Sequence, residues 1–243
     1  MKYALIIGAK SDIAKALAHT FASKDYSLYL AGRNITELED FKKDLSIRYN
    51  VNIELKEFDV VAFDTHQVFY DSLEVKPTVS ILSSGYMNEQ DICQNDFTEA
   101  LNTINVNYTG CVSILNIIAN DYELKKEGDI IGISSVAGDR GRKTNYIYGS
   151  SKAAFSSYLS GLRNRLFGSE VHVLTVKPGF VYTKMTENLE LPAKLTAQPQ
   201  QIADAIYNAF TKKTNILYSK SIWRLIMLII TNIPESIFKR LSI

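Results

Sequence analysis

The sequence contains little of what builds disulfide frameworks, metal sites or flexible linkers. Its 243 residues include two cysteines, three histidines and five prolines. Cys93 and Cys111 form no C-x-x-C pair, and no histidine lies at ligand spacing. We therefore expect no disulfide framework and no zinc site, and a reducing, cytoplasmic compartment. The N-terminal apolar run lacks a small-residue cleavage site, and no apolar run is long enough to cross a bilayer.

An excess of charge of one sign is also missing. Lysine and arginine number 27 against 26 aspartates and glutamates, which gives a formal net charge of +1. The cations are scattered among the acids, so no nucleic-acid role is expected. Hydrophobic residues make up 46% of the chain, enough for one sizeable core. Without repeats or linkers, we expect a single domain at residues 1–220, extended by an apolar helical tail at 221–243.

Continuous apolar runs alternate with helical patterns along most of the chain. Such runs, closed by glycine, serine or aspartate, are typical of strands buried on both faces. Strands are predicted at residues 3–7, 26–31, 51–58, 78–82, 129–134 and 171–176. Helices are predicted at residues 11–23, 36–49, 68–73, 96–119, 148–167 and 198–210. The alternation predicts a Rossmann-type, doubly wound α/β fold with about seven parallel strands, helices on both faces and ligands at the carboxyl ends of the strands.

The segment at 130–155 carries a candidate catalytic group. Ser135 lies thirteen positions before Tyr148, and Lys152 lies four positions after it. Positions i and i+4 share one face of a helix, so the phenol and the ammonium can meet at one site. The ammonium should lower the pKa of the tyrosine, while the serine hydroxyl can bond the carbonyl oxygen that the tyrosine protonates. This is the chemistry that reduces a ketone to an alcohol.

The spacing is not specific by itself. Tyr122 and Lys126 form the same Y-x-x-x-K pattern, but the residue thirteen positions earlier is Thr109. They belong to a charged run, DYELKKEG, which is interpreted as the solvated end of a helix. The Tyr148 copy therefore depends on support from the rest of the chain.

The turn after the first predicted strand has part of the pattern that binds a dinucleotide. Gly8 permits a tight bend and Ala14 permits close packing of helix on strand, but Asp12 stands where a second glycine is usual. The Asp12 carboxylate would repel a diphosphate unless it turns away to cap the helix. A plain helix N-cap explains Ser11 and Asp12 about as well.

A cation follows the second predicted strand, where an acid would bind the ribose of NAD. Arg33 can hold a 2′-phosphate through forked, charge-assisted bonds, and Lys10 can reach the same phosphate. The alternative is that Arg33 is a solvated loop cation. We expect NADP(H) as the cofactor.

Together these motifs resemble the short-chain dehydrogenase/reductase family over nearly the whole chain, in that family's order. GAKSDIA resembles its glycine-rich turn, SSG its N-A-G, INVNYTG its helix asparagine segment, ISSVAG its serine, YGSSK its tyrosine and lysine, and KPGFVYT its P-G segment. Asp12 in place of glycine and Ser83 in place of asparagine depart from the pattern and bear on cofactor affinity. The resemblance implies a reductase acting on C=O and CH–OH groups, assembled as a homodimer or homotetramer.

The resemblance also implies a role for each matching residue. Tyr148 is expected as the general acid, and Lys152 as the group that lowers its pKa and holds the nicotinamide ribose. Ser135 would orient the carbonyl, and Asn107 would support a water that supplies protons through the lysine. The expected cofactor-binding set comprises Gly8, Lys10, Ser11, Asp12, Ile13, Arg33, Asn34, Asp59, Val60, Ser83, Ser84, Gly85, Tyr148, Lys152, Pro178, Gly179, Val181 and Thr183.

A narrower resemblance concerns the substrate. The runs SSVAGDRGRKTNYIYGSSKAAF, GLRNRLFGSEVHVLTVKPGFVYTKMT and WRLIMLIITNIPESIFKRL resemble reductases of the decaprenylphospho-2-keto-erythro-pentose type. This implies a 2-keto sugar carried on a polyprenyl phosphate, in cell-envelope or polysaccharide synthesis. The apolar tail, with Trp223 suited to headgroup level and cations at Lys239 and Arg240, is expected as a helical hairpin on the cytoplasmic membrane face. The alternatives for the tail are a lid over the substrate mouth and a subunit interface.

Three functions are compatible with these observations. The first is NADPH-dependent reduction of a keto sugar. The second is soluble reduction of acyl, polyketide or small ketones, with the tail as a subunit interface. The third is an idle NADP(H)-binding sensor or scaffold, against which the intact catalytic set argues. The residues expected near the substrate are Tyr86, Met87, Arg140, Arg142, Asn145 and Met185, with Arg140 and Arg142 either meeting a substrate phosphate or lying in a solvated loop.

Overall fold

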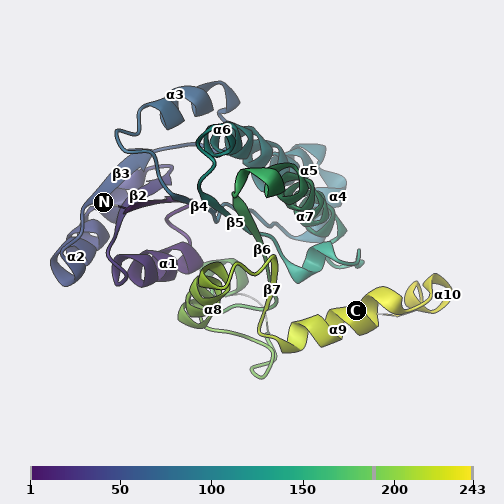
Figure 1. The fold of residues 1–243 in the computed structure, drawn as a ribbon. Coiled ribbons are helices and arrows are strands. Elements are labelled where there is room, and N and C mark those ends of the chain that lie inside the picture. Colours follow the sequence, from purple (N-terminus) through teal and green to yellow (C-terminus); the bar gives the residue numbers. More distant parts are fainter. Residues whose placement is uncertain (1, 188–189, 242–243) are drawn as a thin grey trace.

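The computed structural model describes residues 2–187 and 190–241, and this part of the chain forms a sheet of seven parallel strands (Figure 1). The strand order is β3-β2-β1-β4-β5-β6-β7, and every neighbouring pair is parallel. The strands are β1 (Lys2–Ile7), β2 (Tyr26–Gly32), β3 (Ile53–Glu57), β4 (Val79–Leu82), β5 (Asp129–Ile133), β6 (His172–Pro178) and β7 (Ile216–Ser219). The predicted doubly wound parallel sheet is confirmed.

Helices cover both faces of the sheet, as predicted (Figure 1). On one face lie α1 (Asp12–Ala22), α2 (Glu39–Tyr49) and α8 (Pro199–Thr211), and on the other lie α3 (His66–Asp71), α6 (Gly110–Lys125) and α7 (Tyr146–Leu166). Each group buries an apolar stripe against the strands, which removes that surface from water. The shorter helices α4 (Gln90–Asn95) and α5 (Phe97–Ile104) pack beside α7.

The carboxyl ends of the strands form the edge where the candidate site residues gather. Strand order reverses at β1, because the chain moves outward to β3 and then crosses to β4 on the other side of β1. A crevice at such a reversal is where doubly wound sheets bind ligands. Gly8 leaves β1 with φ of 82°, and a side chain there would come within 2.7 Å of the Ser84 nitrogen. This turn therefore requires glycine.

The predicted helix at 96–119 is interrupted. It consists of α5, a π-helical turn η3 (Asn105–Thr109), and α6, which continues to Lys125. Tyr122, expected at a solvated helix end, is instead buried, and its hydroxyl lies 2.7 Å from that of Ser80. The expectation was wrong because Tyr122 follows buried Ile118 by one helical turn, on the face that packs against the sheet.

The tail forms two helices, α9 (Ile222–Asn232) and α10 (Glu235–Phe238), which project from the body of the molecule (Figure 1). Trp223 was expected at headgroup level, but it is buried, and its indole N–H donates to the Leu195 carbonyl at 3.1 Å. Gly179 makes room for the indole, since a side chain there would lie 1.9 Å from its nitrogen. None of the described helices is long and apolar enough to cross a membrane.

Candidate active site

The catalytic residues expected from the sequence lie where β5 leads into α7. Ser135 follows β5 and caps a short 3-10 turn, η4 (Val136–Gly138), by accepting from the Ala137 N–H at 3.1 Å. Tyr148 and Lys152 stand one turn apart on α7, with the ammonium 5.9 Å from the centre of the phenol ring. Lys152 is buried and donates to the Ile133 carbonyl at 3.2 Å. Ser135, Tyr148 and Lys152 all line one cavity of about 360 Å³.

Burial shifts the pKa values of both Tyr148 and Lys152. It raises the pKa of Tyr148, and the hydrogen bond with Ser135 acts in the opposite direction. Burial also lowers the pKa of Lys152. The expected lowering of the Tyr148 pKa is therefore wrong for this arrangement, because the loss of water around the phenol outweighs the effects that favour phenolate. The phenol is neutral at neutral pH, as is a phenol with the ordinary tyrosine pKa of about 10, and the raised pKa makes it a weaker proton donor than an exposed tyrosine.

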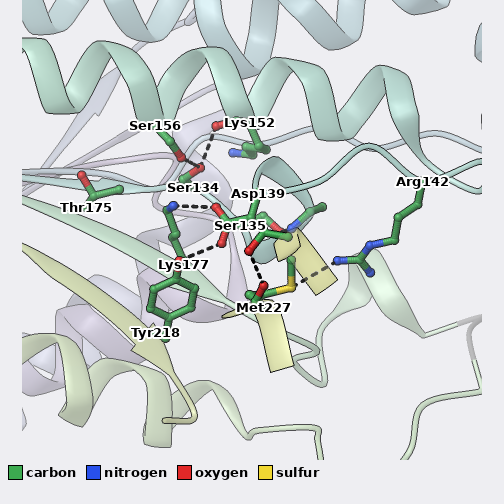
Figure 2. A network of polar contacts seen from close by, with 12 residues as sticks. Ser134, Ser135, Asp139, Arg142, Lys152, Ser156, Thr175, Lys177, Tyr218 and Met227 are labelled. Atoms are coloured by element: carbon green, nitrogen blue, oxygen red, sulfur yellow. Dashed lines mark hydrogen bonds and ion pairs between the residues drawn. The ribbon is translucent and has the colours of Figure 1, made fainter. Parts of the chain in front are cut away.

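Polar contacts behind the cavity hold α7 to β5 and β6 (Figure 2). Ser134 donates to the Lys152 carbonyl at 2.9 Å. Below η4, the Asp139 carboxylate meets the Lys177 ammonium at 2.5 Å and accepts from the Tyr218 hydroxyl at 2.8 Å. These bonds join the segment after β5 to β6 and β7, so they fix the place of Ser135 relative to the strand ends (Figure 2).

Asn107 lies in the π turn and is fully buried. Its side-chain carbonyl accepts from the Tyr86 N–H at 2.9 Å, and its amide donates to the Tyr86 carbonyl at 2.7 Å and to Ser151 at 3.1 Å. Single π turns often mark functional sites. Here the turn places the Asn107 side chain against the segment after β4. The hydrogen bonds of Asn107 connect that segment to α7. Its expected role in supporting a water stays a prediction.

The expected cofactor residues line two cavities that share a wall. A cavity of about 630 Å³ at the ends of β1, β2 and β3 meets the catalytic cavity along Ser11 and residues 83–85. Together the two form one groove across the strand reversal. The groove is lined by every residue of the expected cofactor set: Gly8, Lys10, Ser11, Asp12, Ile13, Arg33, Asn34, Asp59, Val60, Ser83, Ser84, Gly85, Tyr148, Lys152, Pro178, Gly179, Val181 and Thr183.

The two departures from the usual dinucleotide pattern have structural explanations. Ser11, not Asp12, caps α1 by accepting from the Ala14 N–H at 3.2 Å. Asp12 lines the groove and does not cap α1; its carboxylate accepts from the Lys184 N–H at 2.9 Å. It thus ties the start of α1 to the short turn η6 (Lys184–Thr186) after β6. Ser83 lies 2.9 Å from the Ser11 hydroxyl, so the serine at the end of β4 also supports the first turn.

At the far end of the groove, cations and acids surround the site expected for a 2′-phosphate. Arg33 lines the groove after β2. Lys10, expected to reach the same phosphate, forms an ion pair with Glu37 at 2.9 Å. Glu57 also lines the groove, but its carboxylate accepts from the main-chain N–H groups of residues 34 and 35 at 2.8 and 3.1 Å. These bonds hold that acid to the turn, and Arg33 is left to meet a ligand.

The residues expected near the substrate divide into two groups. Met87, Arg142, Asn145 and Met185 line the catalytic cavity. Tyr86 and Arg140 do not. The Tyr86 hydroxyl donates to Glu99 at 2.7 Å, and Arg140 holds the tail through the carbonyls of Thr231 and Ile233 and the Glu235 carboxylate. Both expectations were wrong, because partners remote in the sequence take these side chains. The cavity residues that the sequence did not indicate include Val136, Ala137, Phe180, Lys184, Thr186 and Trp223.

These observations fit a nicotinamide dinucleotide. Gly8 lines the groove at the first turn, and Ser11 and residues 83–85 line the passage to the catalytic cavity. The dinucleotide, when bound, supplies or accepts a hydride. Tyr148 can then give a proton to a carbonyl oxygen that Ser135 also contacts, since both side chains line the same cavity.

Fold and site together define an oxidoreductase that acts on C=O and CH–OH groups. Residues 2–193 match the short chain dehydrogenase family, and the chain belongs to that family. An uncharacterised oxidoreductase of Mycobacterium tuberculosis is 30% identical over 240 residues, which are 98% of this chain and 96% of the relative.

Two solved structures show the same fold. A short chain dehydrogenase of Burkholderia cenocepacia, solved in complex with NADP, gives a TM-score of 0.85 at 19% identity and covers 100% of both chains. A 3-oxoacyl-[acyl-carrier protein] reductase of Brucella melitensis, solved with bound NAD, gives 0.79 at 19% identity and covers 89% of this chain and 88% of that one. Neither likeness distinguishes between the two nucleotides for this chain.

Proposed function

We propose that this protein is an NADPH-dependent carbonyl reductase whose substrate is a 2-keto sugar carried on a polyprenyl phosphate. The observation that carries the reductase is the meeting of Ser135, Tyr148 and Lys152 in one cavity, which is continuous with the dinucleotide groove. The protonated phenol of Tyr148 can donate its proton to the oxygen of a ketone that accepts a hydride from NADPH. The experiment that tests the reductase, a Tyr148→Phe variant assayed with ketones, is developed in the Discussion.

Arg33 supports NADPH over NADH. Its guanidinium lines the groove beyond β2, and the nearby carboxylate of Glu57 is held by two main-chain N–H groups. Guanidinium groups bind phosphates through forked, charge-assisted bonds, whereas NADH carries no 2′-phosphate there.

Replacing Arg33 by serine is expected to weaken NADPH binding about 10–100-fold, since bonds to charged groups contribute about 1.5–3 kcal/mol. NADH binding should change little. Fluorescence titration of both nucleotides measures the effect, with Arg48→Ser, an exposed arginine paired to Asp44 on α2, as the matched control. An Arg33 variant with unchanged preference would assign the 2′-phosphate to another residue.

The tail supports a lipid-linked substrate. One face of α9 closes the catalytic cavity with Trp223 and packs Met227 beside it. The opposite face exposes Leu225, Leu228 and Ile229, which are 54%, 61% and 59% accessible. A helix with such a face, and with exposed cations nearby at Arg224, Lys239 and Arg240, suits the surface of an anionic bilayer. A lipid-borne ketone would then reach the cavity from the membrane.

Replacing Leu225, Leu228 and Ile229 together by glutamine is expected to abolish flotation with anionic liposomes. Each apolar side chain contributes about 1.5–3 kcal/mol when buried in lipid, so binding should fall at least about 100-fold. The variant keeps Trp223 and Met227, so reduction of a small soluble ketone should be unchanged. If the native chain does not float, and light scattering shows the triple variant losing a subunit, this face is a subunit interface and soluble ketones become the leading substrates.

A further inference from the structure

Arg142 enters the catalytic cavity without a partner that matches its charge. It lies between η4 and α7, on the wall that α9 closes. Its terminal nitrogen lies 3.7 Å from the Met227 sulfur, a weak acceptor, as Figure 2 shows. Its Nε is buried and has no hydrogen-bond partner within residues 2–187 and 190–241. A guanidinium has five N–H donors, and the sulfur engages one of them.

Arg140 shows how the same loop satisfies an arginine that serves only the fold. Its guanidinium donates to two tail carbonyls at 3.0 and 3.2 Å and pairs with Glu235 at 2.6 Å. Arg142 has no comparable set of bonds among the described residues. Burial lowers the pKa of Arg142, with Asp139 acting in the opposite direction. Asp139, however, is already bound by Lys177 and Tyr218. A charge left in this state costs free energy that a ligand can recover.

The composition of the cavity matches an anion. Among the lining residues, Arg142, Lys152 and Lys184 are cationic and Asp12 alone is acidic. The Asp12 carboxylate accepts from the main chain of residue 184, so it is occupied. Three residues after Arg142, the Asn145 side-chain carbonyl is buried and also lacks a partner among the described residues. It can accept from a hydroxyl group of a ligand.

We propose that Arg142 binds an oxyanion of the substrate, a phosphate or a carboxylate, while Ser135 and Tyr148 hold its ketone. The inference rests on the proposed carbonyl reductase, because it places both groups of one molecule in one cavity. It narrows the substrate class to ketones that carry a negative charge a short distance from the carbonyl. Asn145 is a second positioning residue, for a hydroxyl between the two ends.

Two matched pairs of small ketones test the subsite. The pairs are hydroxyacetone phosphate with hydroxyacetone, and acetoacetate with its ethyl ester. Each is titrated into the full-length protein saturated with NADP⁺, so that the diphosphate site of the groove is already filled. At least one charged member is expected to bind at least about 10-fold more tightly than its neutral partner, as one charge-assisted fork requires. A gain in the hydroxyacetone pair indicates that Arg142 binds a phosphate, and a gain in the acetoacetate pair indicates a carboxylate.

The Arg142→Met variant should remove that advantage and leave binding of the neutral ketones and of NADP⁺ unchanged. Methionine fills the space beside Met227 without a charge, so the melting temperature of the variant should equal or exceed that of the native chain. Arg48→Met, at an exposed arginine of α2, is the control and should change nothing. If Arg142 serves only the fold, its replacement should instead lower the melting temperature and leave the preference for the charged ketone intact.

The outcomes separate this inference from the function on which it rests. Equal binding of charged and neutral members in both pairs, or an advantage that survives in Arg142→Met, overturns the anion subsite while leaving the reductase in place. The charged ketone can also bind tightly through Arg142 and yet cause no oxidation of NADPH when NADPH replaces NADP⁺. That result supports the anion subsite and counts against the proposed reductase.

Discussion

Replacing Tyr148 by phenylalanine is expected to lower the turnover of ketone reduction about 10²–10⁴-fold, the range that a positioned proton donor contributes. The change removes one oxygen atom from a residue that lines the cavity and shares a hydrogen bond with Ser135. The ring remains, so α7 and the groove should keep their shape. NADPH binding should therefore stay within about threefold, which fluorescence titration measures beside the rate of NADPH oxidation.

The chain provides a matched control at its other Y-x-x-x-K pattern. Tyr122→Phe removes the same atom from a buried tyrosine whose hydroxyl meets Ser80 in the core. It should cost about 1 kcal/mol of stability and leave turnover unchanged. A Tyr148 variant that keeps full turnover would remove the phenol from the reaction. A variant that loses turnover but supports the same cellular role would instead favour a sensor or scaffold.

The pH dependence follows from the direction of the pKa shift. Because burial raises the pKa of Tyr148, its phenol stays protonated from neutral pH past the ordinary tyrosine value of about 10. Loss of the phenol proton should therefore slow the native rate of reduction only above that range. The Lys152 ammonium can lose its proton within that range, because burial lowers the pKa of Lys152. A decline between pH 7 and 9 with weaker NADPH binding would report Lys152, whereas a decline with unchanged NADPH binding would indicate a lowered pKa of Tyr148.

The fold could be predicted because its signals are local. A strand buried on both faces appears as an apolar run that ends in a turn residue, and alternation with helical periods then fixes a parallel sheet. The same logic found the groove, because parallel strands place their carboxyl ends along one edge. Gly8, Arg33 and Ser135 were therefore predicted to converge although they are far apart in the sequence, and they do.

The predictions that were wrong concern side chains whose partners the sequence pattern does not specify. Asp12 bonds a main-chain N–H 172 residues away. Trp223 has the character of an interfacial residue, and only its fit against Gly179 shows that it is buried. The protonation of Tyr148 depends on how completely water is excluded, which spacing does not encode. In each case chemistry was assigned from residue type, and tertiary contacts decided the result.

The π turn at Asn107 could not be predicted from the sequence either, because one extra residue in a helix does not change the apolar pattern. It leads to the second large prediction, that Asn107→Leu lowers stability by about 3 kcal/mol, or about 6–12 °C in melting temperature for a chain of this size. Leucine has a similar volume, but it leaves the Tyr86 N–H and carbonyl and the Ser151 hydroxyl without their partner. Thermal unfolding followed by circular dichroism measures the loss.

Comparison variants distinguish this tie from a general effect of losing an asparagine. Asn120→Leu, on the exposed side of α6, loses only a bond to Arg165 and should stay within about 0.5 kcal/mol of the native chain. Ser151→Ala removes one of the three bonds, together with the bond from Ser151 to the Tyr148 carbonyl, and should cost about 1–2 kcal/mol. Turnover should fall with Asn107→Leu below its melting transition, since residues 84, 85 and 87 line the cavity beside the freed Tyr86. Unchanged stability with lost turnover would instead support the expected role of Asn107 in proton supply, because a water-mediated role needs no structural tie.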